Sequence, residues 1–190
     1  MIRLRPLAAL LLALGVCGCV GQPMGMPQAS TATVEKLRAA DIAPLRIGSF
    51  VPAPAVAGSK DKSMGIRALT LTSPVEGSFA KYLGKTLEVN LQAAGKFDAN
   101  APLSLQGVLT DNDDSAGIDI GTAKLGAKFT LVKDGATLFE KQLNVDDKWD
   151  GAFIGAVAIP DAANHYSALY DSLTLKLLTD SDFLAAAKAK

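Results

Sequence analysis

Two segments that meet at a tight turn constrain the local fold more strongly than any other feature of the sequence. Apolar side chains recur at every second position over residues 124–131, which is the period of a strand with one buried face. Residues 137–145 have the same character, and Lys133-Asp134-Gly135-Ala136 between the two segments is typical of a tight turn. The sequence therefore predicts an antiparallel hairpin with one side against a core.

Further strands are expected before this hairpin. Alternation over residues 45–51 and 103–109 predicts two of them, and the branched residues of 66–72 predict another. The polar run Asp111–Gly121 is interpreted as a loop between strands.

Two main helices are expected between and after these strands. Ser73-Pro74-Val75-Glu76 is typical of a capping box, and apolar residues then recur every three or four positions up to Gly95. A second helix is expected from Asp161, with an apolar stripe of its own. The order of elements indicates an α+β fold, with a mainly antiparallel sheet and the two main helices packed on one face.

Charge and composition exclude some classes of function. The chain has 190 residues with 19 basic and 19 acidic side chains, so no positive surplus favours nucleic acid. Aromatic residues make up only 6% of the chain, which also disfavours a surface that stacks bases. The length suits one domain with a buried core.

The first eighteen residues differ from the rest. Arg3 and Arg5 precede an apolar run over Leu7–Val16, and small residues follow it. A basic start, a short apolar stretch and small residues are the layout of a secretory signal peptide. The run falls short of the roughly 20 apolar residues that a membrane-spanning helix needs. We therefore expect residues 1–18 to be a signal peptide.

The end of this segment carries a motif. Val16-Cys17-Gly18-Cys19 resembles the lipobox of bacterial lipoproteins, which has an aliphatic residue three positions before a cysteine and a small one directly before it. The resemblance implies cleavage before Cys19 and attachment of acyl chains such as palmitate to Cys19. In such lipoproteins an Asp after the cysteine often retains the protein at the inner membrane. Val20 stands there instead, which implies the outer membrane, with the protein facing the periplasm.

The remaining chain divides into two parts. Residues 19–33 contain Pro and Gly, no charge and no periodicity, so we expect a lipidated N-terminus followed by a flexible tether. Residues 34–190 are expected to form a single periplasmic α+β domain.

Candidate chemical sites are few. The acidic run at Asp111 invites a calcium interpretation, but an EF-hand loop starting there would need Gly and Glu where Ala116 and Thr122 stand. His165 is the one histidine, and no nucleophile elbow accompanies it. We therefore predict no catalytic residue, no metal site and no cofactor, and expect that the protein is not an enzyme.

The segment 149–160 is unusual because it is apolar where a loop is normally polar. Trp149, Phe153, Ile154 and Val157 either close over the sheet or form an exposed surface that a protein or lipid partner covers. In the second case these four residues are the candidate partner surface.

The predicted domain also resembles a known group. The order of its elements over residues 45–187 is similar to that of small lipoprotein domains of the YajG type and of ABC-transport auxiliary lipoproteins. The matching features are Ile47-Gly48-Ser49-Phe50, Phe79-Ala80-Lys81-Tyr82-Leu83, Leu103–Leu109 and Tyr166-x-x-Leu169. The resemblance implies a non-catalytic interaction or adaptor module of the cell envelope, whose partner is the membrane and an envelope protein or lipid, with no nucleic acid. The alternatives are a binding module for a small apolar ligand or lipid, and an envelope hydrolase.

Overall fold

The structure is a computed structural model and describes residues 21–189. The predicted signal peptide and Cys19 lie outside the described residues. The elements in chain order are β1 (Gln22–Pro23), α1 (Thr31–Ala39), β2 (Arg46–Pro52), α2 (Ser59–Lys62), β3 (Ser63–Ile66), β4 (Leu69–Thr72), α3 (Phe79–Ala94), β5 (Leu103–Ser115), β6 (Ile120–Lys133), β7 (Ala136–Asp150), α4 (Gly155–Leu178) and α5 (Ser181–Ala186).

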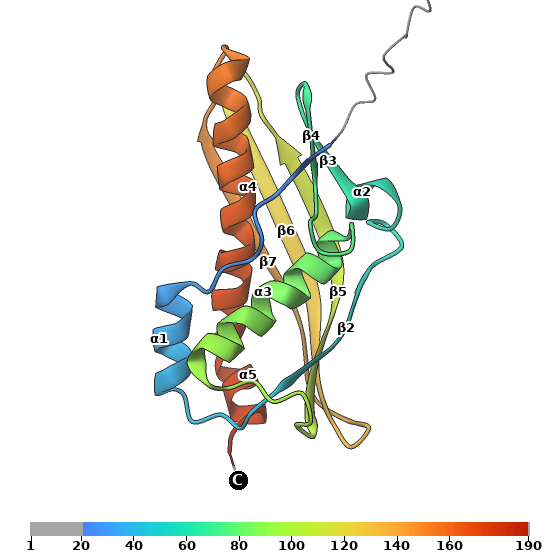
Figure 1. Cartoon of the computed structure of the whole chain (residues 1–190), viewed down its shortest axis with the longest axis vertical. Coiled ribbons are helices and arrows are strands. Elements are labelled where there is room, and N and C mark those ends of the chain that lie inside the picture. Colours follow the sequence, from blue (N-terminus) through green and yellow to red (C-terminus); the bar gives the residue numbers. More distant parts are fainter. Residues whose placement is uncertain (1–20, 190) are drawn as a thin grey trace, which may run out of the picture.

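The main sheet has four strands in the order β2-β5-β6-β7 (Figure 1). The predicted hairpin is confirmed, because β6 and β7 pair antiparallel from Lys133↔Ala136 to Ile120↔Asp150. Its turn has positive φ at both Asp134 (49°) and Gly135 (83°), as a two-residue hairpin turn of the primed type requires.

The fold is α+β, as predicted, but the expected sheet type is wrong. Strand β2 runs parallel to β5, and in the second, three-stranded sheet β1 runs parallel to β4, so both sheets are mixed. Strands β2 and β5 can pair in parallel because α3, which lies between them in the chain, returns the chain to the end of the sheet where β2 begins. The described residues also contain five helices, not only the two long ones that the apolar stripes predicted.

The two long helices cover one face of the main sheet (Figure 1). Their aromatic rings fill the space between the layers: Phe79 of α3 meets Tyr166 of α4 edge-on at 5.7 Å, and Tyr82 meets Tyr170 at 4.8 Å. On the sheet side, Leu125, Ala127, Phe129 and Leu131 are fully buried. This packing positions α4 along the length of the hairpin.

Both helices begin at different residues from those predicted. Helix α3 begins at Phe79, with Ser78 as its cap, and the side chain of Ser78 accepts a hydrogen bond from the Lys81 amide. Buried Asp61 caps the same end, because its Oδ1 accepts from the Ser78 hydroxyl and the Ala80 amide. Helix α4 begins at Gly155, six residues before Asp161, and contains Pro160.

The segment before α1, which we expected to be part of a flexible tether, is packed against the domain. Met24 is only 6% exposed, and its amide donates to the Thr72 carbonyl at 2.9 Å. The Tyr82 hydroxyl donates to the Gly25 carbonyl, and the Ser30 amide donates to Oδ1 of Asn90, which is fully buried. Apolar Met24 and these paired backbone groups outweigh the Pro- and Gly-rich composition that suggested a free chain.

Candidate functional site: an apolar tip at one end of the sheet

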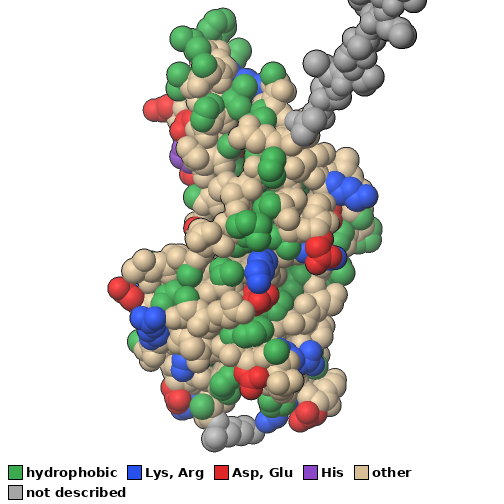
Figure 2. Space-filling model, viewed as in Figure 1, with side chains coloured by type: hydrophobic (Ala, Val, Ile, Leu, Met, Phe, Trp, Pro, Cys, Tyr) green, Lys and Arg blue, Asp and Glu red, His purple; other side chains and the backbone are tan. Residues whose placement is uncertain are grey.

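Exposed apolar side chains gather at one end of the main sheet. Of the eight large apolar side chains that stand exposed on the described residues, five lie in the β5–β6 connection, the β7–α4 connection and the elements next to them. We call this group the apolar tip, and its members are Ile118 (59% exposed), Ile120 (46%), Phe153 (81%), Ile154 (64%) and Val157 (57%). Hydrophobic side chains are visible together at this end of the surface in Figure 2. Such a cluster is typical of a surface that a partner covers.

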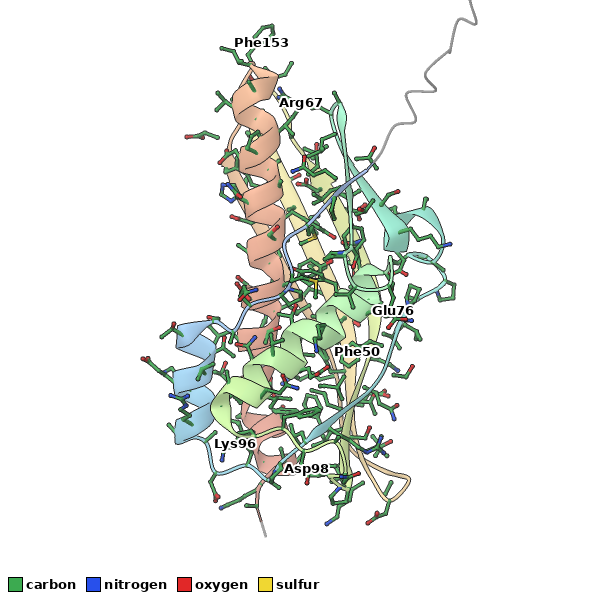
Figure 3. The ribbon with its side chains drawn as sticks, viewed as in Figure 1. Phe50, Arg67, Glu76, Lys96, Asp98 and Phe153 are labelled. Carbon is green, nitrogen blue, oxygen red and sulfur yellow. The ribbon has the colours of Figure 1, made fainter. Side chains whose placement is uncertain are left out.

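Arg67, in the turn between β3 and β4, holds the two connections of the apolar tip together. Its guanidinium donates to the carbonyls of Ala116 (2.8 Å) and Gly117 (3.0 Å) in one connection. It also donates to the carbonyls of Ala152 (2.6 Å) and Phe153 (3.2 Å) in the other. Figure 3 shows Arg67 and Phe153 at the same end of the molecule. The apolar tip is therefore a built arrangement in which four loop carbonyls have a cationic partner.

The structure separates Trp149 from the other three predicted surface residues. The Trp149 ring is half-buried and stacks flat on the His165 ring, with centroids 4.2 Å apart. It also lies over Gly121, where a Cβ would be 2.1 Å from the indole. Trp149 is therefore packed between the sheet and α4, whereas Phe153, Ile154 and Val157 are exposed.

His165 joins the sheet to α4 just below the apolar tip. Its Nδ1 donates to Oδ2 of Asp147 at 2.6 Å, and this hydrogen bond holds the pKa of Asp147 below its usual range. Its Nε2 lies 3.7 Å from Oδ1 of Asp161, one helical turn earlier. Both ring nitrogens thus face carboxylates and one ring face is covered by indole, an arrangement that positions the helix on the strand.

A layer of buried polar side chains lies between β5 and α4. Buried Asn112 of β5 accepts a hydrogen bond from the Tyr166 hydroxyl at 2.6 Å, and its amide donates to the Lys60 carbonyl at 2.7 Å. The Tyr166 hydroxyl is in turn 2.9 Å from that of Tyr170. Burial raises the pKa of both tyrosines far above its usual range, so both remain neutral hydrogen-bonding groups.

Asp114 is the least satisfied group of this layer. Both of its carboxylate oxygens are buried and have no hydrogen-bond partner among the described residues. Burial raises the pKa of Asp114 to about 6, and the nearby Ser115 amide and His165 oppose this shift only in part. The structure thus places a carboxyl with a raised pKa near the end of β5, just before the connection that carries Ile118.

The acidic run at Asp111 belongs to a strand. Asp111–Ser115 forms the end of β5, paired with Gly126–Thr122 of β6, so the interpretation of this stretch as a loop is wrong. Because successive side chains of a strand point to opposite faces, Asn112 and Asp114 face α4 while Asp111 and Asp113 are exposed. The carboxylates therefore do not converge, and residues 21–189 contain no group of three His, Cys, Asp or Glu that could hold a metal ion.

Sequence reasoning missed three residues of this site. Ile118 and Ile120 fall within the run that was interpreted as a polar loop, and their apolar character was the available signal. Arg67 had no signal, because only the folded chain brings the β3–β4 turn to the two connections.

The chain enters the described domain at the same end. Strand β1 pairs parallel to β4 with Gln22 opposite Leu71, and β4 runs away from the turn that contains Arg67. Gly21 lies against Thr70 and Thr72, since a Cβ on it would be 2.6 Å from Thr72 Cγ2. The start of β1 is therefore directed toward the apolar tip (Figure 1). Within residues 21–189, no helix is both long and apolar enough to cross a membrane.

Comparison with known proteins supports the fold alone. No family model and no curated protein sequence matches the chain. The crystal structure of protein XCC0632 from Xanthomonas campestris, of family DUF330, is 12% identical with a TM-score of 0.59, over 87% of this chain and 96% of that one. A minor lipoprotein from Acinetobacter baumannii is 12% identical over 76% of this chain and 96% of its own, but its TM-score of 0.44 is too low to support a conclusion. The chain thus shares the α+β fold of XCC0632.

Proposed function

We propose that the chain is a bacterial lipoprotein, anchored through acyl chains on Cys19 to the outer membrane, and that it is a non-catalytic interaction or adaptor module facing the periplasm. The lipobox-like sequence Val16-Cys17-Gly18-Cys19 supports the anchor. The observation that carries the proposal is the packing of Gly21 at the start of β1, on the side of the apolar tip.

Because Gly21 is packed against the domain, the length of chain between it and Cys19 limits the distance from the domain to the membrane. Cys19 stands two positions before Gly21, and two positions of extended chain span at most about 7 Å. Acyl chains on Cys19 would therefore hold the domain at the membrane surface rather than on a long tether. Several acyl chains together give stable anchoring.

The non-catalytic part of the proposal is supported by what surrounds the one histidine. Both nitrogens of His165 face the carboxylates of Asp147 and Asp161. A hydrolase site would instead need a nucleophile within hydrogen-bonding reach of the base.

Intact mass and membrane fractionation of the expressed full chain test the proposal. We expect the 172 residues that remain when 18 of 190 are removed, plus the mass of acyl groups, in the outer-membrane fraction. Cys19→Ser should abolish both acylation and pelleting. The matched control Cys17→Ser should leave both unchanged, because serine is common at that lipobox position. A soluble, unacylated product from the unmodified chain would refute the anchor.

A small apolar ligand is the second candidate, and one pocket favours it. At the opposite end of the molecule, a depression of about 350 Å³ has a lining that includes Ala43, Pro44, Leu103, Leu138 and the charged Lys133. That volume lies at the lower end of the range for ligand sites. Saturable binding of a fluorescent fatty acid that Leu138→Asp abolishes would support this alternative.

A further inference from the structure

We propose that the apolar tip inserts into the headgroup and acyl boundary of the lipid bilayer beside the Cys19 anchor, so that the domain contacts the membrane at two points. This inference rests on the proposed function and adds to it the occupant of the exposed apolar surface. Ile118, Phe153, Ile154 and Val157 are each more than half exposed, and together they form the part of the domain that enters the membrane.

The described chain begins close to the apolar tip. Strand β1 is parallel to β4, and Gly21 lies against Thr70, three residues after Arg67. At about 3.3 Å per residue, the entry point is on the order of 10 Å along the strand from the Arg67 turn. Arg67 itself is bonded to the Phe153 carbonyl, so the entry point and the apolar tip share one end of the domain.

This arrangement makes even weak insertion effective. Once Cys19 is held in a bilayer, the apolar tip needs no separate encounter with the membrane, because its binding has become an intramolecular step. A partner protein at the same place would have to fit between the apolar tip and the membrane, although only a few residues of chain join the Cys19 anchor to the domain.

Several backbone carbonyls at the apolar tip are paired with hydrogen-bond donors. Unpaired carbonyls are costly in hydrocarbon, and loops that enter a membrane boundary need partners for them. Arg67 donates to the carbonyls of Ala116, Gly117, Ala152 and Phe153, and the Gly151 amide donates to the Asp119 carbonyl at 2.8 Å. The two connections can therefore leave water without losing their hydrogen bonds.

The charges near the apolar tip decide what kind of attraction acts there. Besides the cationic Arg67, Asp119 and Asp150 are exposed at this end, so the charges around the apolar side chains do not form a positive patch that would attract anionic headgroups. Insertion must therefore depend on burial of apolar area, which is insensitive to salt and needs no anionic lipid. Zwitterionic phosphatidylcholine is accordingly the right probe.

The test places a single tryptophan at the apolar tip. In the full chain with Trp149→Phe, Phe153→Trp is compared with Leu138→Trp, which is at the opposite end of the sheet and whose native side chain is 45% exposed. Both proteins are reconstituted into phosphatidylcholine vesicles with brominated acyl chains. We expect quenching of the tryptophan at 153 at least about threefold stronger than at 138, at low and high salt alike.

A charge at the neighbouring position gives a second, independent readout. Ile154→Asp added to the Phe153→Trp protein should remove most of the quenching, because a carboxylate resists entry into the boundary. The matched control is Val51→Asp, which adds the same charge to an exposed apolar position on β2 outside the apolar tip.

The outcomes separate this inference from the anchor. Intact mass of the same sample reports acylation. An acylated protein with equal quenching at 153 and 138 overturns insertion of the apolar tip and leaves the anchor standing. An unacylated protein whose tryptophan at 153 is quenched overturns the anchor and supports insertion.

Discussion

Replacement of Asp114 by asparagine should stabilise the protein at neutral pH and not in acid. The pKa of Asp114 is raised from 3.8 to about 6 by burial. A carboxyl with a raised folded-state pKa holds its proton more tightly when folded. The free energy of unfolding is therefore highest at pH values below about 4, which is the pKa of this carboxyl in the unfolded chain. It falls as pH rises through about 6, the pKa in the folded chain.

The size of the effect follows from this shift. One pKa unit corresponds to about 1.4 kcal/mol, so a shift of about two units gives roughly 3 kcal/mol before screening. Partial access to solvent reduces this to about 1–2 kcal/mol. In a domain of this size, that amount raises Tm by roughly 3–6 °C.

Thermal melts of the full chain followed by circular dichroism would measure the change. Asp114→Asn should raise Tm at about pH 7.5 and leave it nearly unchanged at about pH 4. The control is Asp113→Asn, because Asp113 is 58% exposed and pairs on the surface with Lys60. Asp113→Asn should change the free energy of unfolding by no more than about 0.5 kcal/mol at both pH values. An equal Tm gain for Asp114→Asn at both pH values, or none at neutral pH, would refute the reasoning.

Three further changes test the site and its support. Arg67→Lys keeps the charge but cannot reach four carbonyls, so amide hydrogen exchange over residues 116–118 and 151–154 should accelerate while the core stays protected. Tyr166→Phe leaves the buried Asn112 oxygen unpaired and should cost about 1–2 kcal/mol in urea unfolding, and a cost near zero would refute the bond. Asp61→Ala removes the acceptor at the start of α3 and should cost about 1–3 kcal/mol by the same assay, whereas Lys62→Ala next to it should cost far less.

The parts of the fold that depend on neighbouring residues were predictable from the sequence. The β6–β7 hairpin follows from alternation and an Asp134-Gly135 turn, and the end of α3 follows from Gly95, which has φ of 71°. Each of these signals acts over a few residues. The residues at the turn and at the helix end therefore determine these two features by themselves.

Parallel pairing could not be predicted in the same way. Strands β2 and β5 are joined through two short strands and two helices, and nothing within residues 45–51 records the direction of the distant partner. The start of α3 shows a similar limit, because Ser73 and Ser78 both resemble caps. The carboxylate of Asp61 lies 17 positions from Ser78 and 19 positions from Ala80 in the sequence, so it settles the choice for Ser78 only in the folded chain.

The candidate site was predictable in part. Phe153, Ile154 and Val157 were recognisable as apolar residues in an unusual place, and they do stand exposed. Trp149 shared that signal but packs on His165, because Gly121 on the next strand leaves room for the indole against the sheet. The role of Arg67 arises only from tertiary structure.

The pairing of β1 with β4 has a mechanical consequence. A pull on the N-terminus away from the domain acts along the axis of β1, so it loads the bonds of Gln22–Pro23 and Met24 with β4 in shear and not one after another. The contacts of Gly25 with Tyr82 and of Ser30 with Asn90 lie further along the same line of force. We expect the domain to resist extraction by the proposed lipid anchor as a unit, until these bonds rupture together and the chain as far as α1 detaches.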